Sequence, residues 1–204
     1  MCYNKTMIEI PREATTQIVK ALKEGKVVAL PTETVFGLAI SLNSATALEK
    51  LIYLKRRDLK SGKVFTLVPE SRDAIETYAT VTRAARSFLK YIPGEITLIL
   101  HKNPEFSHPY FNHFSTIGVR IPKSSLFSTI LPLSGPLLLT SANPRGDRPA
   151  TDSETIKETL PKVDVLVTGK TPKGELPSTI VDLTGKKPVL IRQGSLVLPE
   201  LPQL

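Results

Sequence analysis

The stretch Val27-Val28-Ala29-Leu30-Pro31-Thr32-Glu33-Thr34-Val35-Phe36-Gly37-Leu38 joins a short apolar run to a polar cluster. The apolar run is typical of a buried strand, which we expect Pro31 to end because proline lacks a backbone N–H. Side chains two residues apart share a face of extended chain, so Thr32 and Thr34 could present two hydroxyl groups together. Ligands of open α/β sheets gather beyond the carboxyl ends of strands, where these threonines would lie. The alternative is ordinary turn chemistry, because hydroxyl side chains commonly end elements.

Helical and strand-like patterns alternate on both sides of this stretch. Apolar residues recur at helical spacing from Ala14 to Leu22, and Ser44 is a candidate N-cap for a helix over 44–55. Further helices are expected at about 71–79, 82–90 and 153–160, and further strands at 64–68, 96–100, 117–121, 137–140, 163–167, 180–183 and 189–191. Several neighbouring strands lack a helical crossover between them. The sequence therefore predicts an α/β fold with a mixed parallel and antiparallel sheet flanked by helices.

Composition indicates a globular protein with an anionic partner. The 204 residues fit one domain, their hydrophobic content is 41%, and no apolar run reaches the length of a membrane span. The excess of 27 Lys and Arg over 19 Asp and Glu suits a nucleotide, a nucleic acid or a membrane surface, although it could serve only solubility. A single cysteine, Cys2, and the lack of a signal-peptide pattern predict a cytoplasmic protein.

Several familiar catalytic patterns are missing from the sequence. It contains no G-x-x-x-x-G-K-[ST] loop and no G-x-G-x-x-G after a strand, so side-chain cations and hydroxyls would have to hold any nucleotide phosphates. His101, His108 and His113 lack partners at zinc-ligand spacing, and we expect no protein metal site. These histidines fall in a stretch, 101–115, that is predicted to be a long irregular loop and is a candidate lid.

Three other polar groups accompany ends of predicted elements. Ser141 and Asn143 share a face after the strand at 137–140, and turn chemistry is again the alternative. Lys55 and Arg57 could converge on a polyphosphate if the helix ends there, and a solvated basic helix end is the alternative. Arg120, Ser178 and Arg192 stand beside strand ends, where single arginines are usually surface residues.

Taken together, these segments resemble the YrdC-like family of threonylcarbamoyl-AMP synthases over about 24–194. The family's signatures occur here in order, and the ordered series is far more specific than any single piece. The matching segments are Pro31–Leu38, Lys55-Arg56-Arg57, Pro93-Gly94-Glu95-Ile96-Thr97, Gly118–Pro122, Ser141-Ala142-Asn143, Ser178–Asp182 and Arg192-Gln193-Gly194.

The resemblance implies a single twisted α/β domain with a basic concave cavity. It implies that the chain converts L-threonine, bicarbonate and ATP, with Mg²⁺, to threonylcarbamoyl-AMP and pyrophosphate, for use by the machinery that modifies tRNA adenosine 37. By motif, threonine and its carbamate would contact Thr34, Thr66, Arg120, Ser141 and Ser178. ATP would contact Lys55, Arg57, Ser61, Thr116, Asn143, Thr151 and Arg192. Lys55, Arg57, Ser141 and Asn143 would be the catalytic group.

Some positions depart from the family's usual residues. Asp58 stands in place of a proline, Thr66 in place of a histidine associated with the substrate pocket, and Phe36 in place of a tyrosine. Arg145 stands where relatives often carry a serine. These departures imply that the amino-acid selectivity could differ from that of other members.

Two other functions fit parts of the sequence. A non-catalytic RNA-binding module is compatible with the net charge of +8, and weak tRNA binding would also suit an enzyme; the chain has no Trp, however, and its Phe and Tyr are scattered. A carbamoyl transferase acting on another acceptor is the second alternative, because related domains serve in carbamoylation.

Overall fold

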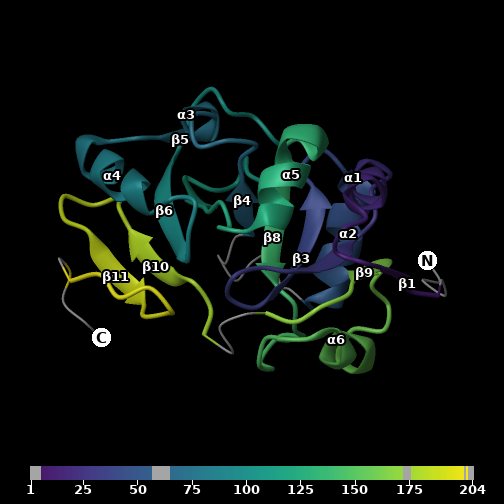
Figure 1. Cartoon of the computed structure of the whole chain (residues 1–204). Coiled ribbons are helices and arrows are strands. Elements are labelled where there is room, and N and C mark those ends of the chain that lie inside the picture. The colour runs from purple at the N-terminus through teal and green to yellow at the C-terminus, as the bar shows by residue number, and fades with distance from the viewer. Residues whose placement is uncertain (1–5, 57–64, 172–175, 200, 202–204) are drawn as a thin grey trace.

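A computed structural model of the chain describes residues 6–56, 65–171, 176–199 and 201, which form one open sheet with helices around it (Figure 1). The sheet has eleven strands among these residues. In order across it lie β1 (Ile8–Ile10), β9 (Val165–Val167), β2 (Val28–Pro31), β3 (Phe36–Ser41), β8 (Leu137–Ser141), β4 (Thr66–Val68), β7 (Thr116–Val119), β6 (Ile96–Lys102), β10 (Thr179–Asp182) and β11 (Val189–Arg192), while β5 (Ala79–Thr80) pairs with β6.

The strand directions make this a mixed sheet. The pairs β1–β9, β2–β9, β4–β7 and β6–β10 are parallel, and the remaining neighbours are antiparallel. Parallel neighbours need a crossover, whereas antiparallel ones can be joined by a short turn. The predicted α/β class with a mixed sheet is confirmed.

The polar stretch that follows β2 forms the bend of a hairpin. Pro31 is the last residue of β2 and pairs with Phe36, the first residue of β3. The sequence does not predict β3, because the polar residues before it indicate a strand end rather than a turn between two strands. Both Phe36 backbone groups are satisfied by a distant segment, since its N–H donates to the Ala150 carbonyl and its carbonyl accepts from the Ala142 N–H. These bonds bring the segment after β8 beside the hairpin.

Most helices agree with the sequence patterns. They are α1 (Thr15–Lys23), α2 (Ala45–Leu54), α3 (Ile75–Tyr78), α4 (Arg83–Phe88) with a 3₁₀ turn at Leu89–Tyr91, α5 (Ser125–Ser134) and α6 (Ser153–Thr159). Ser44 is the N-cap of α2, because its side chain accepts a hydrogen bond from the Ala47 N–H. The sequence does not predict α5, because Pro132 and several Ser and Thr residues weaken its helical pattern.

The helices gather at different parts of the sheet. In Figure 1, α5 crosses in front of β8, α1 and α2 lie at the end that holds β1, and α4 lies towards the end that holds β11. Helix α1 packs against α5, and α6 packs beside β9. No helix within the described residues is long and apolar enough to cross a membrane.

The segment 103–115 packs into the core through its aromatic residues. Phe111 is fully buried and Tyr110 is nearly so. The Tyr110 hydroxyl accepts a hydrogen bond from the Phe65 N–H, and the two rings stack with centroids 5.3 Å apart. His108 stacks on Phe106 and forms a hydrogen bond through Nε2 with the Leu42 carbonyl, and these contacts hold its ring against the rest of the fold. The predicted loop therefore contains a packed aromatic cluster, and its first two residues belong to β6.

Candidate active site

A cavity of about 780 Å³ lies over the middle and the β11 end of the sheet. Its floor follows from strand register, because residues paired across neighbouring strands point to the same face. Gly37 of β3 lies opposite Ser141, and Leu139 of β8 lies opposite Thr66. Farther along, Gly118 lies opposite Ile99, Thr97 opposite Ile180, and Ile180 opposite Arg192. The lining therefore combines apolar side chains, threonine hydroxyls and, from two separate segments, Arg120 and Arg192.

The bend after β2 forms one wall through a hydroxyl network. The Thr32 hydroxyl donates to the Val35 carbonyl and accepts from the Thr34 N–H, and it lies 3.0 Å from the Thr34 hydroxyl. Because the single hydrogen of Thr32 goes to Val35, the Thr34 hydroxyl must donate to Thr32. Thr34 can then act only as an acceptor towards other groups. Thr32 lines the cavity, whereas Thr34 is fully buried.

Arg120 follows β7 and is held by the same bend. Its Nη2 donates to Thr34 Oγ1 at 2.9 Å and to Glu33 Oε1 at 3.1 Å. Both members of this ion pair are buried. The positive charge of Arg120 is therefore balanced by a neighbouring carboxylate.

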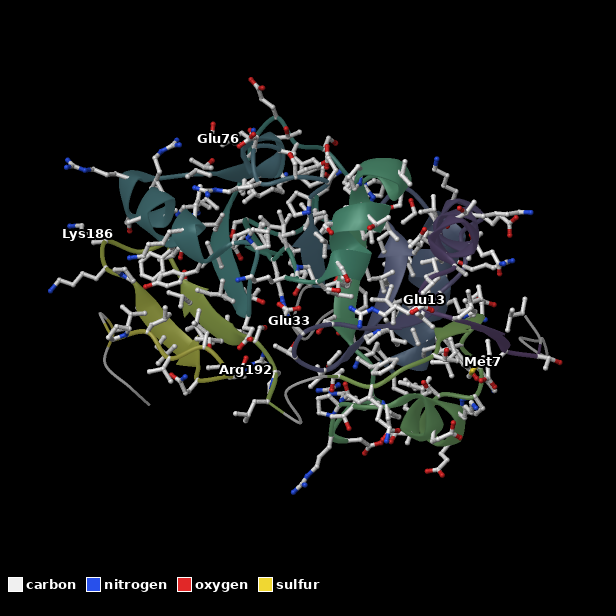
Figure 2. All side chains as sticks on the ribbon, viewed as in Figure 1. Met7, Glu13, Glu33, Glu76, Lys186 and Arg192 are labelled. Carbon is white, nitrogen blue, oxygen red and sulfur yellow. The ribbon has the colours of Figure 1, made fainter. Side chains whose placement is uncertain are left out.

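Arg192, the last residue of β11, forms no ion pair with a carboxylate of the described residues. Its Nε and Nη2 donate to the Ser178 carbonyl at 3.1 and 2.7 Å, and Nη2 also reaches the Ser178 hydroxyl. The side chain is partly open to the cavity, but burial of its guanidinium, followed by the charge of Arg120, lowers the pKa of Arg192. Figure 2 shows Glu33 and Arg192 towards the middle of the molecule and Lys186 at its periphery. Two guanidinium groups whose positive charges repel one another are suited to binding an anionic ligand.

The Ser178 hydroxyl lies 2.9 Å from the Thr97 hydroxyl, which extends the polar surface beside Arg192 onto β6. Thr97 stands within the Pro93–Thr97 motif, but sequence reasoning gave it no role. The sequence motifs likewise gave no role to Glu33. An acidic residue between two threonines was the available signal, and its arginine partner could not be found without the fold.

Lys55 follows the end of α2 and is buried behind Ser141 and Asn143. Its Nζ donates to the Ser141 carbonyl at 2.7 Å, to the Asn143 carbonyl at 2.6 Å and to Asn143 Oδ1 at 2.9 Å. The Ser141 hydroxyl donates to the same Oδ1 at 2.6 Å. In this arrangement Lys55 fixes the turn after β8, whose Ser141 and Asn143 side chains line the cavity.

The remaining predicted residues divide into three groups. Thr66 and Thr116 line the cavity with the residues described above. Thr151 lies elsewhere, and its carbonyl accepts a hydrogen bond from the Thr171 N–H. Arg57 and Ser61 lie outside the described residues. The predicted contacts of all these residues with threonine or ATP stay predictions.

The described residues contain no group of three or more His, Cys, Asp or Glu side chains that could hold a metal ion. Asp147 is the carboxylate side chain in the cavity lining, and it is exposed. Mg²⁺ that arrives on the phosphates of a nucleotide is held largely by phosphates and water, and its presence in this cavity stays a prediction.

The chain is thus an α/β protein with an open mixed sheet, whose cavity is lined by two arginines, hydroxyl groups and apolar side chains. The Sua5_yciO_yrdC family model, described as "Telomere recombination", matches residues 20–194. The chain therefore belongs to the Sua5/YciO/YrdC family, whose named members include nucleotidyltransferase enzymes.

Individual relatives agree with this assignment. The chain is 31% identical to the threonylcarbamoyl-AMP synthase of Vibrio campbellii, over 87% of this chain and 97% of that protein. The crystal structure of Escherichia coli YciO matches with a TM-score of 0.80 and 27% identity, over 93% of this chain and 95% of that one. P. abyssi Sua5 complexed with L-threonine matches with a TM-score of 0.81 and 27% identity, over 94% of this chain and 58% of that one.

Proposed function

We propose that this chain is an L-threonylcarbamoyladenylate synthase that uses L-threonine, bicarbonate or CO₂, and ATP. The observation that carries the proposal is one cavity that brings Arg120 and Arg192 together with the Ser141, Asn143 and Ser178 side chains. The relatives' names and the threonine complex of Sua5 support the same reaction.

The reaction needs charge stabilisation more than it needs a protein nucleophile. The amino group of threonine combines with CO₂ to form a carbamate and releases a proton. A carbamate oxygen then attacks the α-phosphorus of ATP, so that an O–P bond forms while the bond to the β-phosphate breaks and pyrophosphate leaves. Negative charge is present throughout, and fixed cations and hydroxyl donors aimed at it supply the catalysis.

We divide these roles along the sheet as follows. Arg120, with Thr66 and Gly118 near it on the floor, would receive threonine and its carbamate. Arg192 and Asn143, with Thr116 elsewhere in the cavity lining, would receive ATP with its Mg²⁺. An enclosed site also protects the carbamate, which decomposes readily in water.

The same proposal covers the product's destination. Threonylcarbamoyl-AMP would pass to the tRNA threonylcarbamoyl-transfer machinery, and we expect the reaction to take place in the cytoplasm. Weak binding of tRNA to the chain itself would assist that transfer.

The direct test is to incubate the protein with ATP, Mg²⁺, bicarbonate and labelled L-threonine, and to measure pyrophosphate and the labelled adenylate. We expect a product that requires threonine and bicarbonate together. Arg192→Ala should lower the rate at least about 100-fold because it removes a cation from the cavity. Lys186→Ala, a change at an exposed lysine before β11, is the matched control and should retain the rate.

The alternatives give different results in the same experiment. Tight RNA binding without any threonine-dependent product would indicate an RNA-binding module. Formation of a carbamoyl adenylate from ATP and an added carbamoyl donor, without threonine, would indicate carbamoyl transfer to another acceptor. A parallel reaction with L-serine measures the selectivity that Thr66 and Phe36 could alter.

A further inference from the structure

The buried ion pair between Glu33 and Arg120 is incompletely hydrogen-bonded. A single nitrogen, Nη2, serves both Glu33 Oε1 and Thr34 Oγ1. Glu33 Oε2 and Arg120 Nε are both buried and have no hydrogen-bond partner among the described residues. The side chains are only 9% and 8% exposed, so solvent does not satisfy these atoms either.

This arrangement leaves the buried guanidinium of Arg120 with fewer hydrogen bonds than it can form. Arginine and a carboxylate prefer two parallel N–H···O bonds, which here would use Nε and Nη2 with both carboxylate oxygens. A buried polar atom without a partner is costly, and this pair contains two of them. A ligand carboxylate that bound Arg120 through both nitrogens would satisfy more donors than Glu33 does.

We propose that Glu33 is an internal competitor for Arg120, and that an incoming carboxylate displaces it from the guanidinium. The ligand then takes Nε and Nη2, while Glu33 turns out of the pair. Arg120 lines the cavity, so the ligand approaches from the cavity side. That the natural carboxylate belongs to an amino acid rests on the proposed function; the exchange itself does not.

Thr34 explains how Arg120 stays in place during this exchange. Its hydroxyl hydrogen is directed to Thr32, which leaves Thr34 Oγ1 as a permanent acceptor for Arg120 Nη2. The bend after β2 therefore provides one fixed partner and one replaceable partner. In this role Glu33 sets the affinity and the specificity of the site, because a ligand must offer an anionic group with two acceptor oxygens to displace it.

Calorimetric titration of the full chain with propionate tests the exchange. Glu33→Gln keeps the shape of the side chain but removes the charge that favours the pair, so propionate should bind about tenfold more tightly than to the unchanged protein. Asp147→Asn is the matched control, because it removes the same charge from the exposed rim of the same cavity, and it should change the affinity less than about twofold. Equal or weaker binding to Glu33→Gln, an equal gain in Asp147→Asn, or no binding of propionate to either protein would overturn the proposal.

A second measurement uses the unchanged protein and does not depend on the folding of Glu33→Gln. The Nε–H signal of Arg120 is observed by ¹⁵N NMR and assigned through its loss in Arg120→Lys. Saturation with propionate should shift this signal, because Nε gains an acceptor that it lacks in the free protein. An unchanged Nε–H signal at saturation contradicts the exchange.

Parallel titrations with L-threonine separate this inference from the proposed function. If threonine fails to bind while propionate behaves as expected, the proposed substrate is wrong and the exchange at Arg120 stands. If threonine is converted to the adenylate but Glu33→Gln shows no gain for propionate, the exchange is wrong and the proposed function stands.

Discussion

Two arginines face one cavity, and their partners give them different electrostatic roles. Glu33 balances the charge of Arg120, whereas Arg192 donates to neutral oxygens of Ser178. Burial and the charge of Arg120 lower the pKa of Arg192, but arginine remains protonated at neutral pH. Arg192 therefore supplies positive charge that an anionic ligand would neutralise, and we expect it to contribute most to binding of a polyphosphate.

Lys55 acts at the residue scale by holding the turn after β8. Lys55→Met removes a charged donor from three oxygens of Ser141 and Asn143, and a hydrogen bond to a charged group contributes about 1.5–3 kcal/mol. We expect a lower unfolding free energy and, in the folded protein, at least about a tenfold loss of kcat. Urea unfolding and steady-state kinetics measure the two effects.

Lys50→Met is the control for this prediction. Lys50 lies on the same helix and is also buried, but its Nζ pairs with Asp164 at 2.6 Å, away from the cavity lining. Lys50→Met should lower the unfolding free energy, while the kcat of the folded variant should stay unchanged. If both variants lose stability and kcat to the same extent, Lys55 has no specific role in positioning Ser141 and Asn143.

At the scale of elements, the segment after β11 approaches the one before β10 too closely for any side chain. A Cβ on Gly194 would lie 2.2 Å from the Pro177 carbonyl oxygen and 2.5 Å from the Ser178 carbonyl carbon. Both contacts are with backbone atoms, which cannot rotate away. Glycine at this position therefore allows Arg192 to reach Ser178.

Gly194→Ala should lower the unfolding free energy by about 1–3 kcal/mol and reduce activity further, because it separates the two segments that carry Arg192 and Ser178. Gly185→Ala lies in the turn of the same hairpin, where a Cβ would meet only the Lys187 carbonyl oxygen at 3.7 Å. It should change stability by less than about 0.5 kcal/mol. Chemical denaturation of both variants compares them, and equal effects would show that close packing at Gly194 is unimportant.

The N-terminus of α6 gives a pH-dependent prediction. The Asp152 side chain accepts hydrogen bonds from the Thr155 N–H and the Thr155 hydroxyl, and these bonds lower the pKa of Asp152 below its ordinary value of 3.8. A lowered folded-state pKa means that the carboxylate's stabilisation is complete above the unfolded-state pKa and is lost as the pH falls through the folded-state pKa.

Asp152→Ala should therefore cost about 1 kcal/mol of unfolding free energy at pH 7, and its cost should shrink below about pH 4. Asp152→Asn retains a capping oxygen without the charge, so its own stability should not carry this titration. Urea unfolding at pH 7, 5 and 3 follows the difference between each variant and the unchanged protein. A cost of Asp152→Ala that is equal at all three values would contradict the capping role of the carboxylate.

At the scale of the whole molecule, the net charge of +8 favours the binding of polyanions independently of the cavity. We expect tRNA to bind weakly, with a dissociation constant that rises about tenfold or more between 50 and 200 mM salt. Filter binding at several salt concentrations measures this, with and without ATP. Binding that is insensitive to salt would contradict a mainly electrostatic contact, and strong competition by ATP would place the RNA in the cavity itself.

The sequence determined the order of elements in most of the chain, because local patterns decide them. The cap at Ser44, the helix over 45–54 and the final strand pair follow from residues that are neighbours in the chain. The sequence does not predict helix α5, because Pro132 and the hydroxyl residues of the helix oppose the local pattern. In the folded protein, packing against α1 supports the helix. The ordered motifs also identified the family and several of the residues that line the cavity.

Only the tertiary structure decided how these residues act on one another. Glu33 and Arg120 are 87 positions apart, and Lys55 and Asn143 are 88 apart. Strand register brings such residues together across β2, β3, β8, β7 and β11, and register depends on the burial of the whole sheet rather than on any local segment. The sequence of the stretch Val27–Leu38 thus predicts a strand and two hydroxyl groups. The fold made its Glu33 the partner of an arginine and its Thr34 an acceptor with no hydrogen left to donate.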